Sequence, residues 1–141
     1  MSLWQRALTA AQLNAQNAPT LASHLGIVFT EVGADYLKAT MPVDVRTVQP
    51  YGLLHGGASV ALAETVGSTA ANLCIDATRF LCVGQEINAN HVRGVRGGLV
   101  CATARPVHLG SRSHVWSIEI VNAAGQLICI SRLTMAVIER R

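Results

Sequence analysis

The chain has 141 residues, of which 50% are hydrophobic and 13% are charged, and its formal net charge is +3. This length fits one domain, residues 1–141, and the mild charge suits a small anionic ligand better than nucleic acid. No apolar run is long enough to cross a membrane and the N-terminus has no signal-peptide pattern, so we expect a cytoplasmic protein. Its mean hydropathy of +0.35 favours a buried subunit interface.

The first third of the chain predicts two short helices followed by a hairpin. Thr9 to Asn17 is expected to be helical with Thr9 as its N-cap, and 20–25 forms a second helical turn that ends at Gly26. Two extended segments then follow, joined by a glycine-containing turn. These segments and their connections are strand 27–32, turn 33–35, strand 36–43 and the crossing loop 44–54.

A long helix is predicted from about Gly57 to about Asp76. Its apolar residues occur all round the helix, which is typical of a helix enclosed by protein. One carboxylate, Glu64, lies near the middle of this run. A charged group is expensive to bury in such a segment, so Glu64 is expected to have a function.

The remainder of the chain has only strand signals, separated by short turns. Alternation is clearest at His114, Trp116, Ile118 and Ile120, which fall on one face of a strand. Two strands, one long helix and then four strands predict an α+β domain, in which a curved antiparallel sheet wraps a central helix. The four later strands are expected at 79–93, 99–109, 111–121 and 126–138.

Several classes of active site are excluded by the residues that are missing. The chain has no Gly-x-Ser-x-Gly elbow, no dinucleotide or P-loop glycine motif, and no Cys-x-x-Cys pair. Neither its five histidines nor its four cysteines have the spacing of zinc ligands. We therefore expect no metal and no cofactor, and we expect free, reduced thiols.

The remaining candidate chemistry lies at His55-Gly56-Gly57 and at Glu64. Unpaired N–H groups at a helix start can stabilise an oxyanion, so the N–H of Gly56 or Gly57 is a candidate donor and Glu64 a candidate base or nucleophile. Eight residues separate Gly56 from Glu64, or roughly 12 Å along a helix. One carbonyl cannot contact both groups of the same chain, which predicts an active site shared across a dimer interface.

Several segments together resemble the hotdog-fold acyl-CoA thioesterases that use a helix-borne glutamate, the Arthrobacter-type 4-hydroxybenzoyl-CoA and phenylacetate-pathway thioesterases. The resemblance covers nearly the whole chain. It is closest to the bacterial subgroup of 1,4-dihydroxy-2-naphthoyl-CoA thioesterase and the proofreading thioesterase of enterobactin synthesis. A Gln before His-Gly-Gly and a Glu after it make the pattern specific. The matching segments are 41–44, 49–50, 52–58, 62–64, 67–68, 86–91 and 108–110.

This resemblance implies catalytic roles for five residues. Glu64 would be the nucleophile or the base that activates water. The Gly56 N–H would polarise the thioester carbonyl with help from His55. Gln49 would position the thioester or the water, and Ser68 would support the attack.

The resemblance also implies a binding site for the CoA nucleotide and a set of partners. The substrate would be an acyl-CoA, with aromatic acyl groups favoured, and the working unit a homodimer that assembles into a homotetramer. An acyl or aryl carrier protein is a further candidate partner. The implied nucleotide-binding residues are Gly84, His91, Val92, Arg93, Gly94, His108, Leu109, Gly110, Ser111, Arg112 and Ser113.

Other interpretations of these residues remain open. Glu64 could be a partly exposed helix residue paired with an arginine, and His55 could only shape the turn. Gly56 and Gly57 could be needed for the backbone alone. At the level of function, the alternatives are a hotdog enoyl-thioester hydratase or dehydratase and a non-catalytic acyl-CoA-binding protein.

Overall fold

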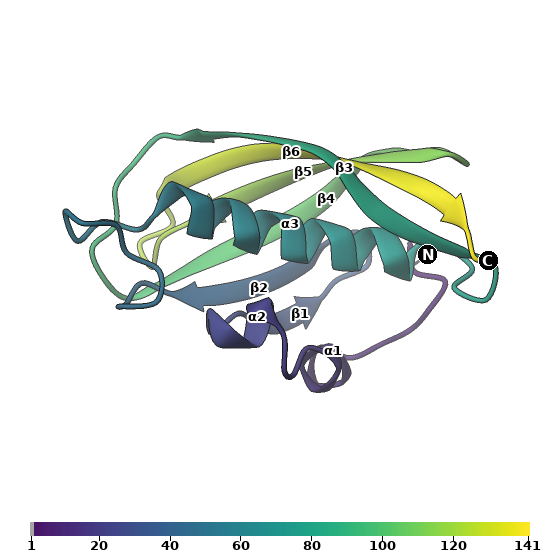
Figure 1. Ribbon diagram of the computed structural model, residues 1–141, viewed down its shortest axis with the longest axis horizontal. Coiled ribbons are helices and arrows are strands. Elements are labelled where there is room, and N and C mark those ends of the chain that lie inside the picture. The colour runs from purple at the N-terminus through teal and green to yellow at the C-terminus, as the bar shows by residue number, and fades with distance from the viewer. Residues whose placement is uncertain (1) are drawn as a thin grey trace.

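The computed structural model describes residues 2–141 as a curved six-stranded antiparallel sheet with one long helix on its concave side. Figure 1 shows this helix, α3, running across the sheet, with two short helices below it. The strands lie in the order β1-β2-β4-β5-β6-β3, which places β1 and β3 at the two edges. The predicted α+β arrangement of two strands, one helix and four strands is therefore confirmed.

The elements begin and end close to the bounds expected from the sequence. They are α1 (Ala10–Gln16), α2 (Leu21–His24), β1 (Val28–Val32), β2 (Leu37–Pro42), α3 (Gly56–Leu73), β3 (Phe80–His91), β4 (Leu99–Leu109), β5 (Ser113–Val121) and β6 (Leu127–Glu139).

The long helix begins within one residue of its expected start but ends three residues before its expected end. It begins at Gly56, one residue early, because the His55 side chain caps it by accepting a hydrogen bond from the Gly57 N–H. It ends at Leu73 rather than near Asp76, because Asp76 belongs to the turn into β3. The Asp76 carbonyl accepts a hydrogen bond from the Phe80 N–H at 2.9 Å, and the Asp76 carboxylate accepts one from the N–H of Thr78.

The core lies between one face of α3 and the concave face of the sheet. The predicted alternation on β5 is confirmed: Trp116, Ile118 and Ile120 are fully buried. A side chain at Gly67 would come within 2.7 Å of Leu133 on β6, so α3 packs closely on the sheet at that point. The opposite face of α3, which includes Glu64, is only half-buried within the chain. The apolar residues around α3 predicted a helix enclosed on all sides, but within one chain only one face of α3 is fully buried.

An asparagine side chain covers part of each sheet edge by bonding a strand as a neighbouring strand would. On β1, Asn14 of α1 accepts from the Phe29 N–H at 2.7 Å and donates to its carbonyl at 2.9 Å. On β3, Asn72 of α3 accepts from the Cys82 N–H at 2.9 Å and donates to its carbonyl at 3.0 Å. The second pair fixes the position of β3 relative to α3.

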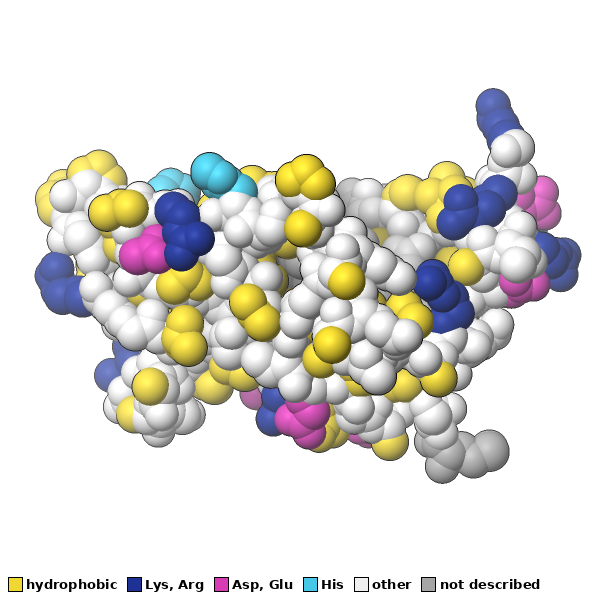
Figure 2. All heavy atoms as spheres, turned by 90° about the horizontal axis from the view of Figure 1, so that it is seen from below, with side chains coloured by type: hydrophobic (Ala, Val, Ile, Leu, Met, Phe, Trp, Pro, Cys, Tyr) yellow, Lys and Arg dark blue, Asp and Glu magenta, His cyan; other side chains and the backbone are white. Residues whose placement is uncertain are grey.

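Figure 2 shows the molecule from below the view of Figure 1, and on this face hydrophobic side chains are spread among polar and backbone atoms. Lys and Arg side chains lie mainly toward its two ends, with acidic groups among them. None of the helices described in residues 2–141 has the length and hydropathy needed to span a membrane.

Candidate active site

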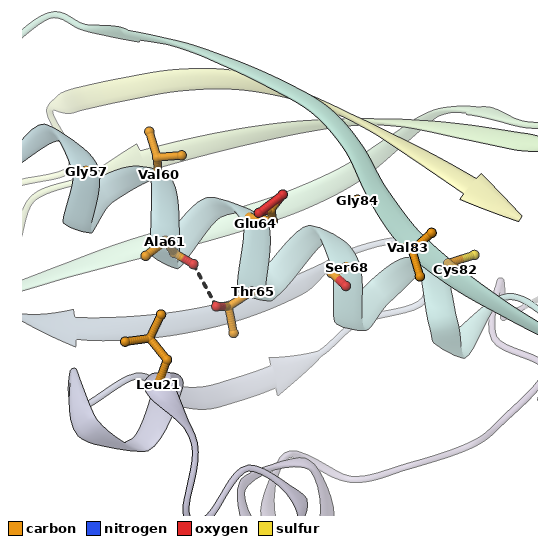
Figure 3. Close-up of a pocket in the computed structure, with 10 residues that line it drawn as sticks. All are labelled: Leu21, Gly57, Val60, Ala61, Glu64, Thr65, Ser68, Cys82, Val83 and Gly84. Carbon is orange, nitrogen blue, oxygen red and sulfur yellow. Dashed lines mark hydrogen bonds between the residues drawn. The ribbon is translucent and has the colours of Figure 1, made fainter.

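Glu64 lies at a pocket of about 700 Å³ between the half-exposed face of α3, strand β3 and helix α2, referred to here as the Glu64 pocket. In Figure 3 the Glu64 side chain extends from α3 toward β3. The pocket combines small and apolar side chains with one carboxylate and two hydroxyl groups. Its lining residues are Leu21, Gly57, Val60, Ala61, Glu64, Thr65, Ser68, Cys82, Val83 and Gly84.

Glu64 has no ion-pair partner among the described residues, so the interpretation as an arginine-paired helix residue is wrong for this chain. Ser68 lines the same pocket one helical turn later, as the sequence predicted, but no hydrogen bond joins it to Glu64. The hydroxyl of Thr65 donates to the Ala61 carbonyl at 2.7 Å within the helix. The carboxylate is thus left free for a ligand or water.

The Cys82 thiol also lines the Glu64 pocket but is poorly suited to act as a nucleophile. Burial raises the pKa of this thiol to about 11, so it stays protonated near neutral pH. The reactive form of cysteine is the thiolate. Glu64 is therefore the better candidate for the reacting group in this pocket.

A second pocket of about 380 Å³ lies at the N-terminus of α3 and is referred to here as the Gly56 pocket. It brings together six residues that the resemblance assigned to the site, from two segments far apart in the sequence. It shares no lining residue with the Glu64 pocket. Its lining residues are Gln49, Leu53, Leu54, Gly56, Ser59, His91, Val92, Arg93, Gly94 and Ile128.

The two glycines at the start of α3 differ in what their N–H groups can do. The Gly57 N–H donates to the His55 Nδ1 at 2.8 Å, so it is not a free oxyanion donor. The Gly56 N–H has no acceptor among the described residues, and Gly56 lines the pocket. A side chain at Gly56 would come within 2.9 Å of the His91 Nε2. Of the two candidate oxyanion donors, only the Gly56 N–H is therefore free within residues 2–141. The His55 side chain serves as the N-cap of α3.

Gln49 lies in the loop before α3, and hydrogen bonds from its backbone to other residues of that loop fix its position. Its N–H donates to the Leu53 carbonyl at 2.8 Å, and its carbonyl accepts from the Gly52 N–H at 2.9 Å. Its side-chain oxygen accepts from the Tyr51 N–H. The side-chain amide nitrogen of Gln49 is then the group that remains to meet a ligand in the Gly56 pocket.

The last of the expected binding segments, 108–113, lies away from both pockets within one chain. It forms the β4–β5 turn, which is closed by a 2.8 Å hydrogen bond from the Gly110 N–H to the Ser113 carbonyl. Leu109, Gly110 and Ser111 line a separate hollow of about 450 Å³ beside the end of α3. His108, Arg112 and Ser113 line none of these three pockets.

Sequence reasoning missed the residues that shape the Glu64 pocket without carrying chemistry of their own. Leu21 and Val83 have no motif around them, and only the folded arrangement brings them to Glu64. Asn72 lies outside this pocket but holds β3 beside it through its bonds to Cys82. Within residues 2–141, no group of three or more His, Cys, Asp or Glu side chains is placed to hold a metal ion.

The chain is similar to several known proteins along almost its whole length. The sequence pattern of the thioesterase superfamily matches residues 51–129. The 1,4-dihydroxy-2-naphthoyl-CoA hydrolase of Escherichia coli is 52% identical over 136 residues, or 96% of this chain and 99% of that protein. The proofreading thioesterase EntH of Cronobacter sakazakii is 49% identical over 136 residues, or 96% of this chain and 98% of that protein.

A solved structure supports the same relationship at the level of the fold. A mutant of thioesterase PA1618 from Pseudomonas aeruginosa superposes with a TM-score of 0.97 at 50% identity, covering 99% of this chain and 100% of that one. A helix wrapped by a curved antiparallel sheet is the hotdog fold, as the resemblance implied. The chain therefore belongs to the thioesterase superfamily and is a thioester hydrolase.

Proposed function

We propose that the chain hydrolyses an acyl-CoA, with an aromatic acyl group favoured, to the free acid and CoA. The observation that carries this proposal is the unpaired carboxylate of Glu64 in a pocket with small and apolar walls. Such a group can act as a base or a nucleophile toward a thioester. The names of the E. coli and Cronobacter relatives, a naphthoyl-CoA hydrolase and a proofreading thioesterase, support the substrate class.

We further propose that the active site combines the Glu64 pocket of one subunit with the Gly56 pocket of a partner. The two pockets share no residue, and each holds only some of the proposed catalytic groups: Glu64 and Ser68 line one, and Gln49 and Gly56 line the other. Strand β3 supports this arrangement, because its outer edge over Phe80–His91 pairs with no strand within residues 2–141. An open edge of that length is a ready site for pairing with a second copy. A homotetramer would arise from two such dimers.

The proposed reaction begins when Glu64 takes a proton from a water molecule. The hydroxide adds to the thioester carbon, and the resulting oxyanion accepts a hydrogen bond from the Gly56 N–H of the partner. The carbon–sulfur bond then breaks, and the departing thiolate of CoA takes up the proton that Glu64 removed from water. In the nucleophilic variant, the Glu64 carboxylate attacks the thioester carbon first, and the carbon–sulfur bond breaks to release the CoA thiolate and leave a mixed anhydride. Water then hydrolyses the anhydride, which frees the acid, restores Glu64 and supplies the proton that the thiolate takes up. Gln49 would orient the water or the thioester in either case.

The CoA nucleotide is proposed to lie along 91–94 of one subunit and 108–113 of another. His91 and Arg93 line the Gly56 pocket and suit phosphate oxygens, and Arg112 adds a further guanidinium on the β4–β5 turn. A carrier-protein thioester would present the same pantetheine arm. We also propose a cytoplasmic location, which the four free cysteines support.

Glu64→Gln tests the proposed chemistry. The variant keeps the side-chain volume but loses the base, so kcat toward aryl-CoA substrates should fall by about 10²–10⁴-fold. The matched control is Glu86→Gln, an exposed glutamate on β3 whose carboxylate accepts hydrogen bonds only from the Asn88 side chain among the described residues. Undiminished turnover in Glu64→Gln, with the control also active, would contradict the proposal.

Gly56→Pro tests the oxyanion donor, because proline removes the N–H and is favoured at the first position of a helix. The preceding residue, His55, already has φ −66° and ψ 130°, the conformation that proline requires before it. Gly56→Ala is the control, since it adds the same Cβ beside His91 but keeps the N–H. We expect kcat to fall by about 10²–10³-fold more in the proline variant.

Mixed dimers test whether the site is shared between subunits. Gly56→Pro and Glu64→Gln chains, co-expressed in equal amounts, would each be inactive alone. Half of the dimers would be mixed, and one of the two sites in each would be intact, which gives roughly a quarter of wild-type activity. No recovery in mixed dimers isolated by two affinity tags would refute the shared site.

A further inference from the structure

Gly84 on β3 lies so close to the carboxylate of Glu64 that no side chain would fit between them. A Cβ placed on Gly84 would lie 2.7 Å from the Glu64 Oε1, 3.4 Å from its Cδ and 4.0 Å from its Oε2. These are the three nearest atoms to that position, and all belong to one carboxyl group. The carboxylate therefore occupies the space in which a side chain at position 84 would begin.

The backbone at this position gives no separate reason for glycine. Positive φ angles occur at Gly26, Gly52, Gly98 and Gly125, and Gly84 is not among them. Gly84 precedes a shift in the pairing of β3 with β6, yet it still pairs with Met135. Any residue could adopt this extended conformation, so the benefit of glycine here lies in the space left for Glu64.

Glu64 has little else to hold its side chain. It makes no hydrogen bond or ion pair with the described residues, and a glutamate side chain without a partner samples several rotamers. Strand β3, by contrast, is fixed against α3 two residues before Gly84, where Asn72 bonds both the N–H and the carbonyl of Cys82. Gly84 thus belongs to a strand that is attached to α3 close by, and Figure 3 shows the Glu64 side chain extending from α3 toward this strand.

We infer that Gly84 is a positioning residue for the reaction: its missing side chain leaves the space in which the Glu64 carboxylate stands when it meets the thioester. This inference rests on the proposed role of Glu64. Any side chain at position 84 would turn the carboxylate away from β3. Gly84 thereby acts through Glu64, and it does so whether or not it also contacts CoA.

The inference predicts that Gly84→Ala lowers kcat by about 100-fold, the scale of loss that follows from a misplaced reacting group, with KM changed much less. The matched control is Gly97→Ala, because a Cβ at Gly97 meets no atom within 4 Å and its φ is not positive. This control should retain wild-type kcat. Gly84→Ala with wild-type kcat would overturn the inference.

A double-mutant cycle separates positioning from a general effect on the strand. In the Glu64→Ala background, where the carboxylate is absent, Gly84→Ala should change neither the residual kcat nor Tm. In the Glu64 background it should lower kcat strongly but Tm only slightly, because the carboxylate is the end of a flexible side chain and can turn aside. Equal losses in the two backgrounds would overturn the inference, since Gly84 would then act independently of Glu64.

The same set of variants distinguishes a failure of the proposed function from a failure of the positioning role of Gly84. If Glu64→Ala keeps full turnover, the proposed function fails, while the difference in Tm still reports whether Gly84 and Glu64 compete for space. If Glu64→Ala abolishes turnover but Gly84→Ala does not reduce it, the proposed function stands and the positioning role of Gly84 is refuted.

Discussion

Replacing Asn72 with alanine should loosen the attachment of β3 to α3. The variant removes two hydrogen bonds, of 2.9 and 3.0 Å, that join this side chain to the N–H and carbonyl of Cys82, and a third, of 2.9 Å, to the Ser68 carbonyl within α3. Each of the two bonds to β3 contributes about 1 kcal/mol net, and the two half-buried backbone groups lose their partner together. Alanine recovers a few tenths of a kcal/mol through its helix propensity. We therefore expect a loss of about 2 kcal/mol in the free energy of unfolding.

Urea titration at a fixed protein concentration measures this loss, because subunit association would make the midpoint depend on concentration. For a chain of this length the corresponding fall in Tm is roughly 4–8 °C. The control is Asn90→Ala, an exposed asparagine on the same strand whose side chain makes no hydrogen bond within residues 2–141. It should stay within about 0.5 kcal/mol of wild type. Equal midpoints for Asn72→Ala and wild type would refute the reasoning.

Three further outcomes follow from the described contacts. His55→Ala should lose about 1 kcal/mol of stability by removing the cap on the Gly57 N–H, and His55→Asn should restore most of it in urea titrations. Burial, and then the nearby His108, lower the pKa of His114 from 6.5, so the unfolded chain binds that proton more readily. Stability from this residue is therefore complete above pH 6.5 and is lost as the pH falls, and His114→Phe should reduce the difference in Tm between about pH 7.5 and 5.5. Burial, and then the neighbouring Cys82, raise the pKa of the Cys74 thiol to about 12, so iodoacetamide at about pH 8 should modify it only after unfolding, as mass spectrometry can measure. Rapid alkylation of the native thiol, or an unchanged pH difference in His114→Phe, would contradict the respective expectation.

The secondary structure could be predicted from the sequence because its signals are local. Thr9 caps α1 by accepting from the Gln12 N–H, and Gly26 adopts a positive φ where the second helix stops. The alternation on β5 directly reports which side chains face α3. The end of α3 is harder to place from the sequence, because Asp76 is compatible with a helix. In the structure it forms a turn instead: its carboxylate accepts from the Thr78 N–H and its carbonyl from the Phe80 N–H.

The candidate site was predictable in its chemical groups and less so in its geometry. Glu64 stands out because a charge is rare in such an apolar run, and the His-Gly-Gly turn marks the helix start. Gly84 was expected on the basis of resemblance to contact CoA, whereas in the structure a Cβ at this position would meet the Glu64 carboxylate. Asn72 carries no signal at all, because its two bonds to Cys82 depend on how α3 and β3 cross.

The two asparagines at the sheet edges have different consequences for growth of the sheet. Asn14 occupies both backbone groups of Phe29 on β1, and α1 covers that strand, so a further strand cannot be added there. Asn72 occupies only Cys82 on β3, and the strand continues for nine more residues, from Val83 to His91. A sheet with one blocked and one open edge can add only a single further sheet. Assembly through β3 would therefore stop at two copies, which protects the protein from open-ended polymerisation into fibrils.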